Sequence, residues 1–324
     1  LVISSANIDF VQRMRRVPYS GETVTEMDNG YSYVPGGKGA NSAIAFSRLG
    51  ADCVFACKLG RDANGKRLSA IYAKEGIDTR YIWEDDEHPT GLASILVEEN
   101  GKNRIIVYPG ANNYITPADI EEPFTCYPDA VYMQLEIPFD AVVEATKRAN
   151  ESGIPVFIDA GPASVDYDLS RLGKVEIFSP NESETRVFTG ITPNSEENCL
   201  RAAIKLSTLV DANYIVLKLG DRGAFLYDGK QYWTFPAEDT PVVDTTAAGD
   251  VFTAALTYWY LEKGNILKAA DFAGCAAAVS VSRAGASTSV PTLSEVIAFA
   301  KARAKAKDGA EADESAEVEA GAEQ

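Results

Sequence analysis

The sequence predicts an α/β protein with a mainly parallel central sheet, helices on both faces of that sheet, and a second, small β-sheet. Three observations support this prediction. Apolar strands alternate with helical stretches over most of the 324 residues, one hairpin signal follows the last of these strands, and two further segments each have the pattern of short strands with no helix inside the segment. Alternation of strands and helices is typical of parallel sheets that are covered on both faces.

The alternation runs from the N-terminus to about residue 219. Buried strands are expected at residues 1–5, 53–59, 130–135, 155–159, 176–179 and 214–219. Helices are expected between them at residues 41–49, 65–75, 139–151, 182–189 and 196–209. A hairpin of residues 224–227 and 231–235 follows, because Asp228-Gly229 is a strong two-residue turn. Helices at residues 248–263, 266–282 and 293–305 complete the predicted domain.

Two segments, residues 22–34 and 92–107, interrupt this alternation. Both have the pattern of short β-strands, and Asn100-Gly101 predicts a hairpin turn within the second segment. They could form a simple hairpin at the edge of the main sheet or a small sheet of their own. The pattern alone leaves both arrangements open.

Composition narrows the possible classes of function. The formal net charge of −17 disfavours nucleic acid and anionic membranes as partners, because both are themselves negative. Residues 308–324 hold seven acidic residues and no basic one, so this tail is expected to be disordered or a frayed helix. Five scattered cysteines favour free thiols in a reducing cytoplasm over disulfides or a zinc site. No apolar run reaches the length of a membrane span.

The most informative local feature is the run Asp244-Thr245-Thr246-Ala247-Ala248-Gly249-Asp250, which leads into a predicted helix. A helix N-terminus has unpaired N–H groups and a partial positive charge, so it binds anions such as phosphate. Small residues leave room for the anion, and Asp250 adds a carboxylate beside it. Because a carboxylate next to phosphate is costly, we interpret Asp250 as a general base that deprotonates an attacking alcohol. The alternative is an ordinary helix start in which Asp250 only favours the dipole.

A second glycine-rich run is Pro35-Gly36-Gly37-Lys38-Gly39-Ala40-Asn41, which opens another predicted helix. Its glycines allow the backbone to approach a ligand closely, and Lys38 and Asn41 can donate hydrogen bonds to hydroxyl groups. Near the N-terminus, Asn7 and Asp9 follow the first predicted strand, and the Asp9 carboxylate could accept from two sugar hydroxyls. A plain turn at the end of a strand is the competing interpretation of Asn7 and Asp9.

Other patterns disfavour a P-loop, a dinucleotide-binding fold, a Ser-His-Asp triad and a histidine metal site. Residues 60–67 nearly match a P-loop, but Arg67 stands where Ser or Thr is needed to hold magnesium. No Gly-x-Gly-x-x-Gly run is present, so the usual dinucleotide-binding fingerprint is missing. His88 is the only histidine, which disfavours a Ser-His-Asp triad and a histidine metal site.

Five motifs, taken together in chain order, resemble those of the ribokinase-like sugar kinases of the phosphofructokinase-B type. They are Asn7-x-Asp9, Gly21-Glu22-Thr23-Val24-Thr25, Gly36-Gly37-Lys38-Gly39-Ala40-Asn41, Pro180-Asn181-Glu182-x-x-Thr185 and Asp244-Thr245-Thr246-Ala247-Ala248-Gly249-Asp250. The resemblance covers about residues 1–300. It implies a three-layer α/β/α ribokinase-like fold over residues 1–307, with a β-sheet lid built from about residues 10–34 and 90–108.

The resemblance also implies residue roles. Asp250 would activate the primary hydroxyl of the sugar, and the N–H groups of Ala247, Ala248 and Gly249 would hold the transferring phosphoryl group. The sugar would be bound by Asn7, Asp9, Gly37, Lys38, Asn41, Glu136 and Asp250. ATP would be bound by Asn181, Glu184, Lys218, Leu219, Gly220, Asp221, Arg222, Gly223 and Gly249. Asn181 and Glu184 would act around Mg²⁺, usually through water.

Two of these residues have a competing interpretation. Glu136 follows a predicted strand and could be a solvated strand end. Lys218 stands where many relatives have Thr, and it would either add a phosphate contact or point away from the nucleotide.

A potassium site and a dimer are further implications of the resemblance. The K⁺ loop would consist of Asp244, Thr246, Ser280, Arg283, Gly285 and Ser289, although an ordinary loop at a helix end is the alternative. A homodimer joined through the lids is expected, because the lid has strand edges and one apolar face that need cover. Candidates for that face include Tyr31, Tyr33, Ile95, Ile105 and Val107.

The implied function is ATP-dependent phosphorylation of a sugar. The Gly-Gly-Lys-Gly-Ala-Asn form of the second glycine run favours D-ribose, phosphorylated on its 5-hydroxyl. Kinases for another furanose, a ketose or a nucleoside are the alternatives among enzymes. A non-catalytic sugar or nucleotide sensor is the alternative from another class, and the intact Asp250 and anion-hole residues argue against it.

Overall fold

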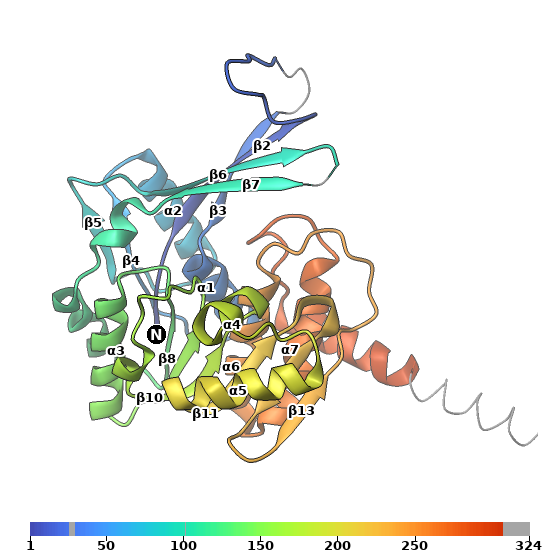
Figure 1. Cartoon of the computed structure of the whole chain (residues 1–324). Helices are drawn as coiled ribbons and strands as arrows, with labels where there is room; N and C mark the ends of the chain where they lie inside the picture. Colours follow the sequence, from blue (N-terminus) through green and yellow to red (C-terminus); the bar gives the residue numbers. More distant parts are fainter. Residues whose placement is uncertain (26–29, 101, 307–324) are drawn as a thin grey trace, which may run out of the picture.

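The computed structural model of the chain describes residues 1–25, 30–100 and 102–306. The predicted acidic tail at residues 308–324 lies outside the described residues, and so does Gly101 of the predicted lid turn. The described chain forms a body around a nine-stranded sheet, and a four-stranded sheet projects from this body (Figure 1). This architecture confirms the predicted three-layer α/β/α fold with a second, small sheet.

The large sheet is mainly parallel. Its strand order is β13-β12-β11-β10-β9-β8-β1-β4-β5. Neighbouring strands from β5 to β11 are parallel, whereas β11, β12 and β13 form the predicted antiparallel end. The strands are β1 (Val2–Ile3), β4 (Phe55–Gly60), β5 (Ile82–Asp85), β8 (Val131–Gln134), β9 (Val156–Asp159), β10 (Lys174–Ser179), β11 (Asp211–Lys218), β12 (Ala224–Tyr227) and β13 (Tyr232–Phe235).

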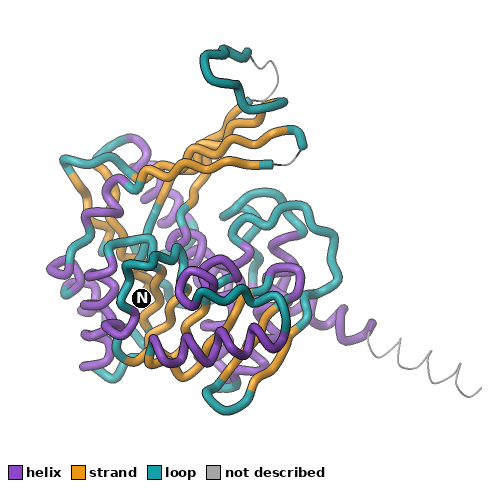
Figure 2. Tube along the Cα trace, viewed as in Figure 1, coloured by secondary structure: helices purple, strands orange, loops and turns teal. Residues whose placement is uncertain are grey.

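Helices lie on both faces of this sheet (Figure 2). The α-helices are α1 (Lys38–Leu49), α2 (Ala63–Lys74), α3 (Phe139–Glu151), α4 (Glu182–Thr189), α5 (Glu196–Leu209), α6 (Ala248–Lys263) and α7 (Ile266–Val281), and residues 293–306 are also helical. Short 3₁₀ helices are η1 (Gly110–Tyr114), η2 (Pro117–Ile120), η3 (Glu122–Cys126), η4 (Leu169–Leu172) and η5 (Gly220–Arg222). Helices α3, α4, α5 and α6 have the predicted bounds.

Two helices begin earlier than predicted. Helix α1 starts at Lys38 because Gly37, with φ of 90°, turns the chain directly into the helix. Helix α2 starts at Ala63 because the Asp62 side chain accepts a hydrogen bond from the Gly65 N–H and caps it. The segment that resembles a P-loop is therefore a capped helix start.

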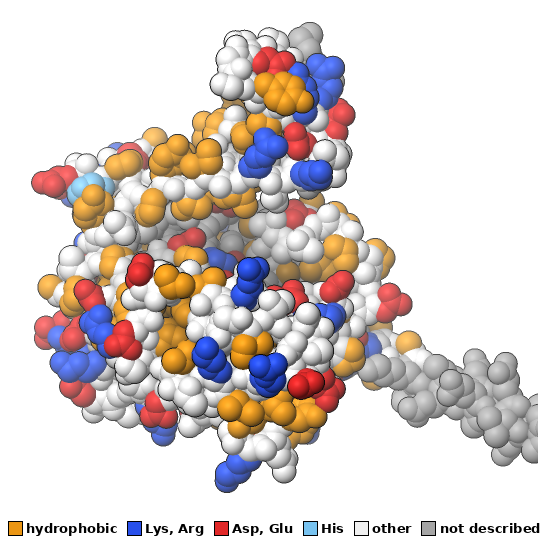
Figure 3. Space-filling view, in the orientation of Figure 1, with side chains coloured by type: hydrophobic (Ala, Val, Ile, Leu, Met, Phe, Trp, Pro, Cys, Tyr) orange, Lys and Arg blue, Asp and Glu red, His pale blue; other side chains and the backbone are white. Residues whose placement is uncertain are grey.

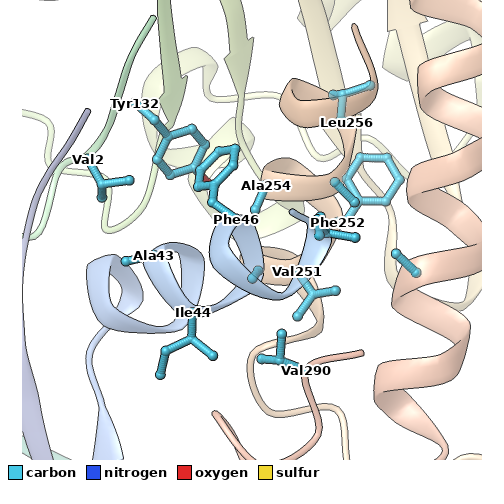
Figure 4. Close-up of a cluster of buried hydrophobic side chains, with 14 of the residues drawn as sticks. Val2, Ala43, Ile44, Phe46, Tyr132, Val251, Phe252, Ala254, Leu256 and Val290 are labelled. Carbon is cyan, nitrogen blue, oxygen red and sulfur yellow. The ribbon is translucent and has the colours of Figure 1, made fainter. Parts of the chain in front are cut away.

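The sheet separates two apolar cores. Successive strand residues point to opposite faces, so Val2, Phe55 and Tyr132 pack with α1, α6 and α7, whereas their neighbours Ile3, Ala56 and Met133 pack with α3 and α5. On the first face, α1 and α6 are in direct contact (Figure 4). Phe46 of α1 lies beside Ala254 of α6, and Ile44 and Val251 belong to the same cluster. This contact holds the N-termini of two helices close together.

The small sheet forms the lid. Its order is β3-β2-β6-β7, with β2 and β6 parallel and the other pairs antiparallel. The strands are β2 (Asn7–Met14), β3 (Tyr31–Gly36), β6 (Gly91–Glu98) and β7 (Asn103–Tyr108). Figure 3 shows a hollow between this lid and the body.

Three expectations about these strands are wrong. The first strand is only β1, because the chain leaves the large sheet at Ser4 and enters β2 at Asn7. Asn7 and Asp9 therefore lie within a lid strand and not in a turn. Strand β5 was not predicted, because its Glu84 and Asp85 have the polarity of a loop. The lid also lacks a single apolar face: strand register puts Ile105 on the face of Asp9, but Tyr33 on the opposite face with Phe10.

Candidate active site

The N-terminus of α6 is arranged to receive an anion. Its N-cap residue Ala247 has a left-handed conformation with φ of 62°, and among the described residues no side chain caps the helix. By contrast, a side-chain oxygen caps α4, α5 and α7. A non-glycine residue at positive φ is strained, and such strain is typical of functional sites. The Ala248 N–H donates to the Thr245 carbonyl at 3.2 Å, whereas no described residue accepts from the N–H groups of Gly249 and Asp250, which are therefore open to an anionic ligand.

Asp250 lies in the first turn of α6 and is buried, with 5% of its surface exposed. The Asn41 Nδ2 donates to its Oδ2 at 2.8 Å, and the Lys38 Nζ lies 3.7 Å from its Oδ1. Burial raises the pKa of the Asp250 carboxyl, and the Lys38 ammonium partly offsets this effect. A carboxylate with a raised pKa is suited to accept a proton. Asn41 and Lys38 thus meet the predicted base across the contact between α1 and α6.

Lys218 lies beneath the same helix start. Its Nζ is 2.6 Å from the Asp159 Oδ2 and 3.2 Å from the Thr253 Oγ1. A Cβ placed on Gly249 would lie 3.7 Å from this nitrogen, so the ammonium is close to the backbone that is predicted to bind an anion. Asp159 was not predicted as a site residue, although its position at the carboxyl end of β9 is one where α/β proteins collect ligands. Its Oδ1 has no hydrogen-bond partner among the described residues.

The sugar-binding residues predicted near the N-terminus lie where β2 leaves the body. Asp9 is buried against Gly36, where an added Cβ would lie 2.1 Å from the Asp9 carboxyl carbon. Burial, together with the charges of Glu136 and Asp250, raises the pKa of Asp9 to about 7. Glu136 is not a solvated strand end, because its Oε2 accepts from the Lys38 N–H at 3.0 Å and from the Ser5 hydroxyl. It therefore supports the start of α1.

Asn112 belongs to this region and was not predicted. It lies in η1, just after the last lid strand, and its Nδ2 donates to the Asn7 Oδ1 at 2.8 Å. The only sequence signal is its position in Pro109-Gly110-Ala111-Asn112, a turn that follows a strand. The side chain is buried, with 1% of its surface exposed.

A cavity of about 1030 Å³ extends from Asp250 between the η5 loop and α7. Of the predicted ATP-binding residues, those that line it are Asn181, Lys218, Gly220, Asp221, Gly223 and Gly249. Its apolar wall includes Phe252, Ala270, Gly274, Ala277 and Val281. Size and lining suit a nucleotide with an apolar contact for its base.

Three of the predicted ATP-binding residues do not line this cavity. The Leu219 side chain is buried in the core. Arg222 pairs with Glu182 and donates to the Pro193 carbonyl at 2.6 Å, so it braces the loop. Glu184 forms a capping box with Asn181 at the start of α4 through its Oε2.

Glu184 nevertheless lies near Lys218 and Lys38, the two lysines of the candidate site. Its Oε1 lies beside Gly161, since a Cβ there would be 2.2 Å away, and it forms no hydrogen bond with the described part of the chain. Burial raises the pKa of Glu184, and Lys218 opposes this effect. The free carboxylate oxygens of Glu184 and Asp159 are hard oxygen ligands of the kind that Mg²⁺ prefers, directly or through water.

The predicted potassium loop joins two segments through Asp244. The Asp244 Oδ1 accepts from the N–H and hydroxyl of Thr246, and its Oδ2 accepts from the Gly285 N–H at 2.9 Å. Burial alone would raise the pKa of Asp244, but these hydrogen bonds outweigh it and lower the pKa. The Ser280 and Ser289 hydroxyls bond to each other, and Arg283 turns away to Glu295. Asp244, whose pKa these hydrogen bonds lower, is the carboxylate that the predicted potassium site requires.

Among residues 1–25, 30–100 and 102–306, no group of three or more His, Cys, Asp and Glu side chains is arranged to hold a metal ion. His88 stacks on Tyr114, and its Nδ1 lies 3.1 Å from the Asp85 Oδ1. Each helix in the described residues is too short or too polar to be a membrane span.

A buried carboxylate beside an uncapped helix N-terminus, with a lid on one side and a nucleotide-sized cavity on the other, defines a small-molecule kinase. The model of the pfkB family of carbohydrate kinases matches residues 1–293. The chain belongs to this family. The predicted family and enzyme class are therefore confirmed.

Individual relatives agree with the family. The chain is 33% identical over 302 residues to the ribokinase of Haemophilus influenzae, covering 92% of this chain and 97% of that protein. It is 35% identical over 301 residues to a bifunctional ribokinase/ribose-5-phosphate isomerase A of Fructilactobacillus sanfranciscensis, of which it spans 55%. The structure of Arabidopsis thaliana ribokinase complexed with ribose and ATP superposes with a TM-score of 0.82 at 30% identity, over 92% of this chain and 97% of that one.

Proposed function

We propose that the chain is an ATP-dependent ribokinase, which transfers the γ-phosphoryl group of ATP to the 5-hydroxyl of D-ribose. The observation that carries the proposal is the position of Asp250. This residue lies in the first turn of α6, whose start has no side-chain cap, and it is hydrogen-bonded to Asn41, one of the predicted sugar-binding residues. The relatives that bear the name ribokinase support this choice of sugar.

Asp250 is the general base. It takes the proton of the 5-hydroxyl as the oxygen attacks the γ-phosphorus, and its raised pKa suits that transfer. Asn41 holds the carboxylate in place, and the Lys38 ammonium offsets its charge while the phosphoryl group approaches. The N–H groups at the start of α6, at residues 247–249, stabilise the charge that develops on the phosphoryl oxygens.

The sugar lies between β2 and the start of α1. The Asp9 carboxylate accepts hydrogen bonds from sugar hydroxyls, and the Asn7 amide donates to another. Gly36 and Gly37 contribute by leaving room: an added Cβ on Gly37 would lie 2.8 Å from the Asn7 backbone nitrogen. Glu136 acts by holding the start of α1 and thereby Lys38.

ATP occupies the cavity beside α7, with its phosphates at the start of α6. Lys218 contacts a phosphate, because its ammonium lies beneath the anion-binding backbone. Mg²⁺ would be held near the free oxygens of Glu184 and Asp159 and would neutralise phosphate charge. K⁺ would be held at Asp244 and would fix the backbone at residues 247–249.

The active form is a homodimer joined through the lids. On the lid face that carries Asp9, Ile105 and Val107 are 54% and 45% exposed. On the opposite face, Tyr31 is 70% exposed. Apolar surface of this extent needs cover, and a second lid would also stiffen the first one over the sugar. None of the five cysteines, all of them in the described part of the chain, forms a disulfide, and four are buried, which supports a reducing cytoplasm as the compartment.

A coupled assay of ADP release tests the function. It compares ribose, deoxyribose, fructose, tagatose and nucleosides with wild type and with Asp250→Asn, which keeps the shape of the side chain. We expect ribose to be the best substrate and Asp250→Asn to lower turnover by about 10²–10⁴-fold. Faster turnover of another sugar or a nucleoside would reassign the substrate, and no turnover with any of them would favour a sensor.

A further inference from the structure

Asn112 ties together the chain segments that connect the lid to the body. Its Oδ1 accepts from the Ala6 N–H at 2.9 Å, where β2 begins. Its Nδ2 lies within hydrogen-bond distance of the Ala6 carbonyl (3.1 Å), the Pro109 carbonyl (2.9 Å) and the Asn7 Oδ1 (2.8 Å). Gly91, at the start of β6, completes the cluster, since an added Cβ would lie 2.4 Å from this nitrogen.

The backbone dictates which way both amides point. A backbone N–H can only donate, so the atom of Asn112 that faces the Ala6 N–H is its oxygen, and its NH₂ group must face Asn7. The NH₂ group can only donate, so Asn7 turns its carbonyl oxygen towards Asn112. The NH₂ group of Asn7 has no hydrogen-bond partner in the described residues and is the donor that remains.

We propose that Asn112 is a positioning residue that sets the sugar specificity of the site by orienting the Asn7 amide; this rests on the proposed sugar kinase function. Asn7 and Asp9 are two residues apart on one strand and so point to the same face. The site then presents one donor, the Asn7 NH₂, beside one acceptor, the Asp9 carboxylate. A sugar fits this pair when one of its hydroxyls accepts a hydrogen bond from the Asn7 NH₂ and the neighbouring hydroxyl donates one to the Asp9 carboxylate.

The first test is the variant Asn112→Asp, which keeps the shape but replaces the NH₂ group by an oxygen. When the new carboxyl group is ionised it can only accept, so the Asn7 amide must turn its NH₂ towards residue 112 and present an oxygen to the sugar. Binding is therefore measured over a range of pH, because a protonated carboxyl group would still donate to Asn7. We expect the Kd for ribose, measured by calorimetry without ATP, to rise about three- to tenfold, the loss typical of one hydrogen bond. The KM for ATP should stay unchanged.

Asn150→Asp is the matched control. Asn150 also bridges the N–H and the carbonyl of one residue, Lys174, but it lies at the end of α3, far along the chain from Asn7. It should leave ribose affinity unchanged. In an Asn7→Ala background, Asn112→Asp should have no further effect on ribose affinity, because the amide through which it acts is gone.

The outcomes separate positioning from a general structural role. An equal rise in ribose Kd with and without the Asn7 side chain, or a parallel rise in the KM for ATP, would overturn the proposal. If Asn112→Asp does not fold, Asn7→Asp decides, because it keeps the bond from Asn112 and replaces only the NH₂ that faces the sugar. Unchanged ribose affinity in that variant would overturn the proposal, whereas a wild-type chain that phosphorylates no sugar would overturn the proposed function itself.

Discussion

Replacing Lys218 by methionine removes the only cation within hydrogen-bond distance of Asp159 in the described chain. The side chains are 12% and 1% exposed, and the Nζ–Oδ2 distance is 2.6 Å. The second oxygen of Asp159 already lacks a hydrogen-bond partner among the described residues. Lys218→Met therefore leaves a buried carboxylate without its hydrogen-bonded cation, and such a loss costs about 3–5 kcal/mol of unfolding free energy.

An exposed pair of similar length provides the control. Arg171 and Asp140 are 2.8 Å apart, but their side chains are 48% and 66% exposed. Arg171→Met should therefore cost at most about 1 kcal/mol. The double variant Lys218→Met/Asp159→Asn should recover most of the stability lost in Lys218→Met, because no buried charge remains.

Urea unfolding followed by circular dichroism measures these free energies. A Lys218→Met variant that loses no more stability than Arg171→Met would refute the reasoning, and so would a double variant in which the two losses simply add. The phosphate contact is tested by comparing the double variant with Asp159→Asn alone, since the KM for ATP should be higher when Lys218 is also replaced. Equal KM values for ATP in these two variants would show that Lys218 only neutralises Asp159.

Four further predictions follow from the site and the lid. Gly36→Ala should abolish measurable ribose binding in calorimetry while ATP binding persists, because the methyl group displaces the Asp9 carboxylate; intact ribose binding would contradict this. The folded pKa of Asp9, about 7, lies above its ordinary 3.8, so folding favours the protonated form. Stability should therefore fall, and ribose affinity should rise, between about pH 4 and pH 7, with both changes reduced in Asp9→Asn. Turnover should be higher in potassium than in sodium or tetramethylammonium at equal ionic strength, and equal rates would make the Asp244 loop merely structural. Sedimentation at micromolar concentration should show a dimer that Ile105→Glu converts to monomer; a wild-type monomer would contradict the lid contact.

Elements with local signals were predictable from the sequence. Helix α4 has its capping box at Asn181 and a glycine in the left-handed conformation at Gly190, so both of its ends are encoded in adjacent residues. The true end of the strand predicted at residues 1–5 could not be predicted from the sequence. The change from the large sheet to the lid depends on pairing with β4, β6 and β8. Nothing in Ser4-Ser5-Ala6 itself signals that change.

The site residues also divide into those that local motifs predict and those that depend on distant parts of the chain. Asp250 and Lys38 stand in motifs whose chemistry is visible locally. Asp159 and Asn112 were missed because their meaning comes from partners that are 59 and 105 positions away in the chain. Arg222 stands in the right motif, but its side chain braces the loop, which depends on the position of Glu182.

The residues proposed to take part in phosphoryl transfer and those proposed to select the sugar lie in different parts of the fold. Asp250 and Asn41 belong to two helices that pack in the core of the body, whereas Asn7 and Asp9 belong to a strand of the projecting sheet. We therefore expect substitutions in the lid strands to change sugar binding or the proposed subunit contact while the proposed general base keeps its place in the body.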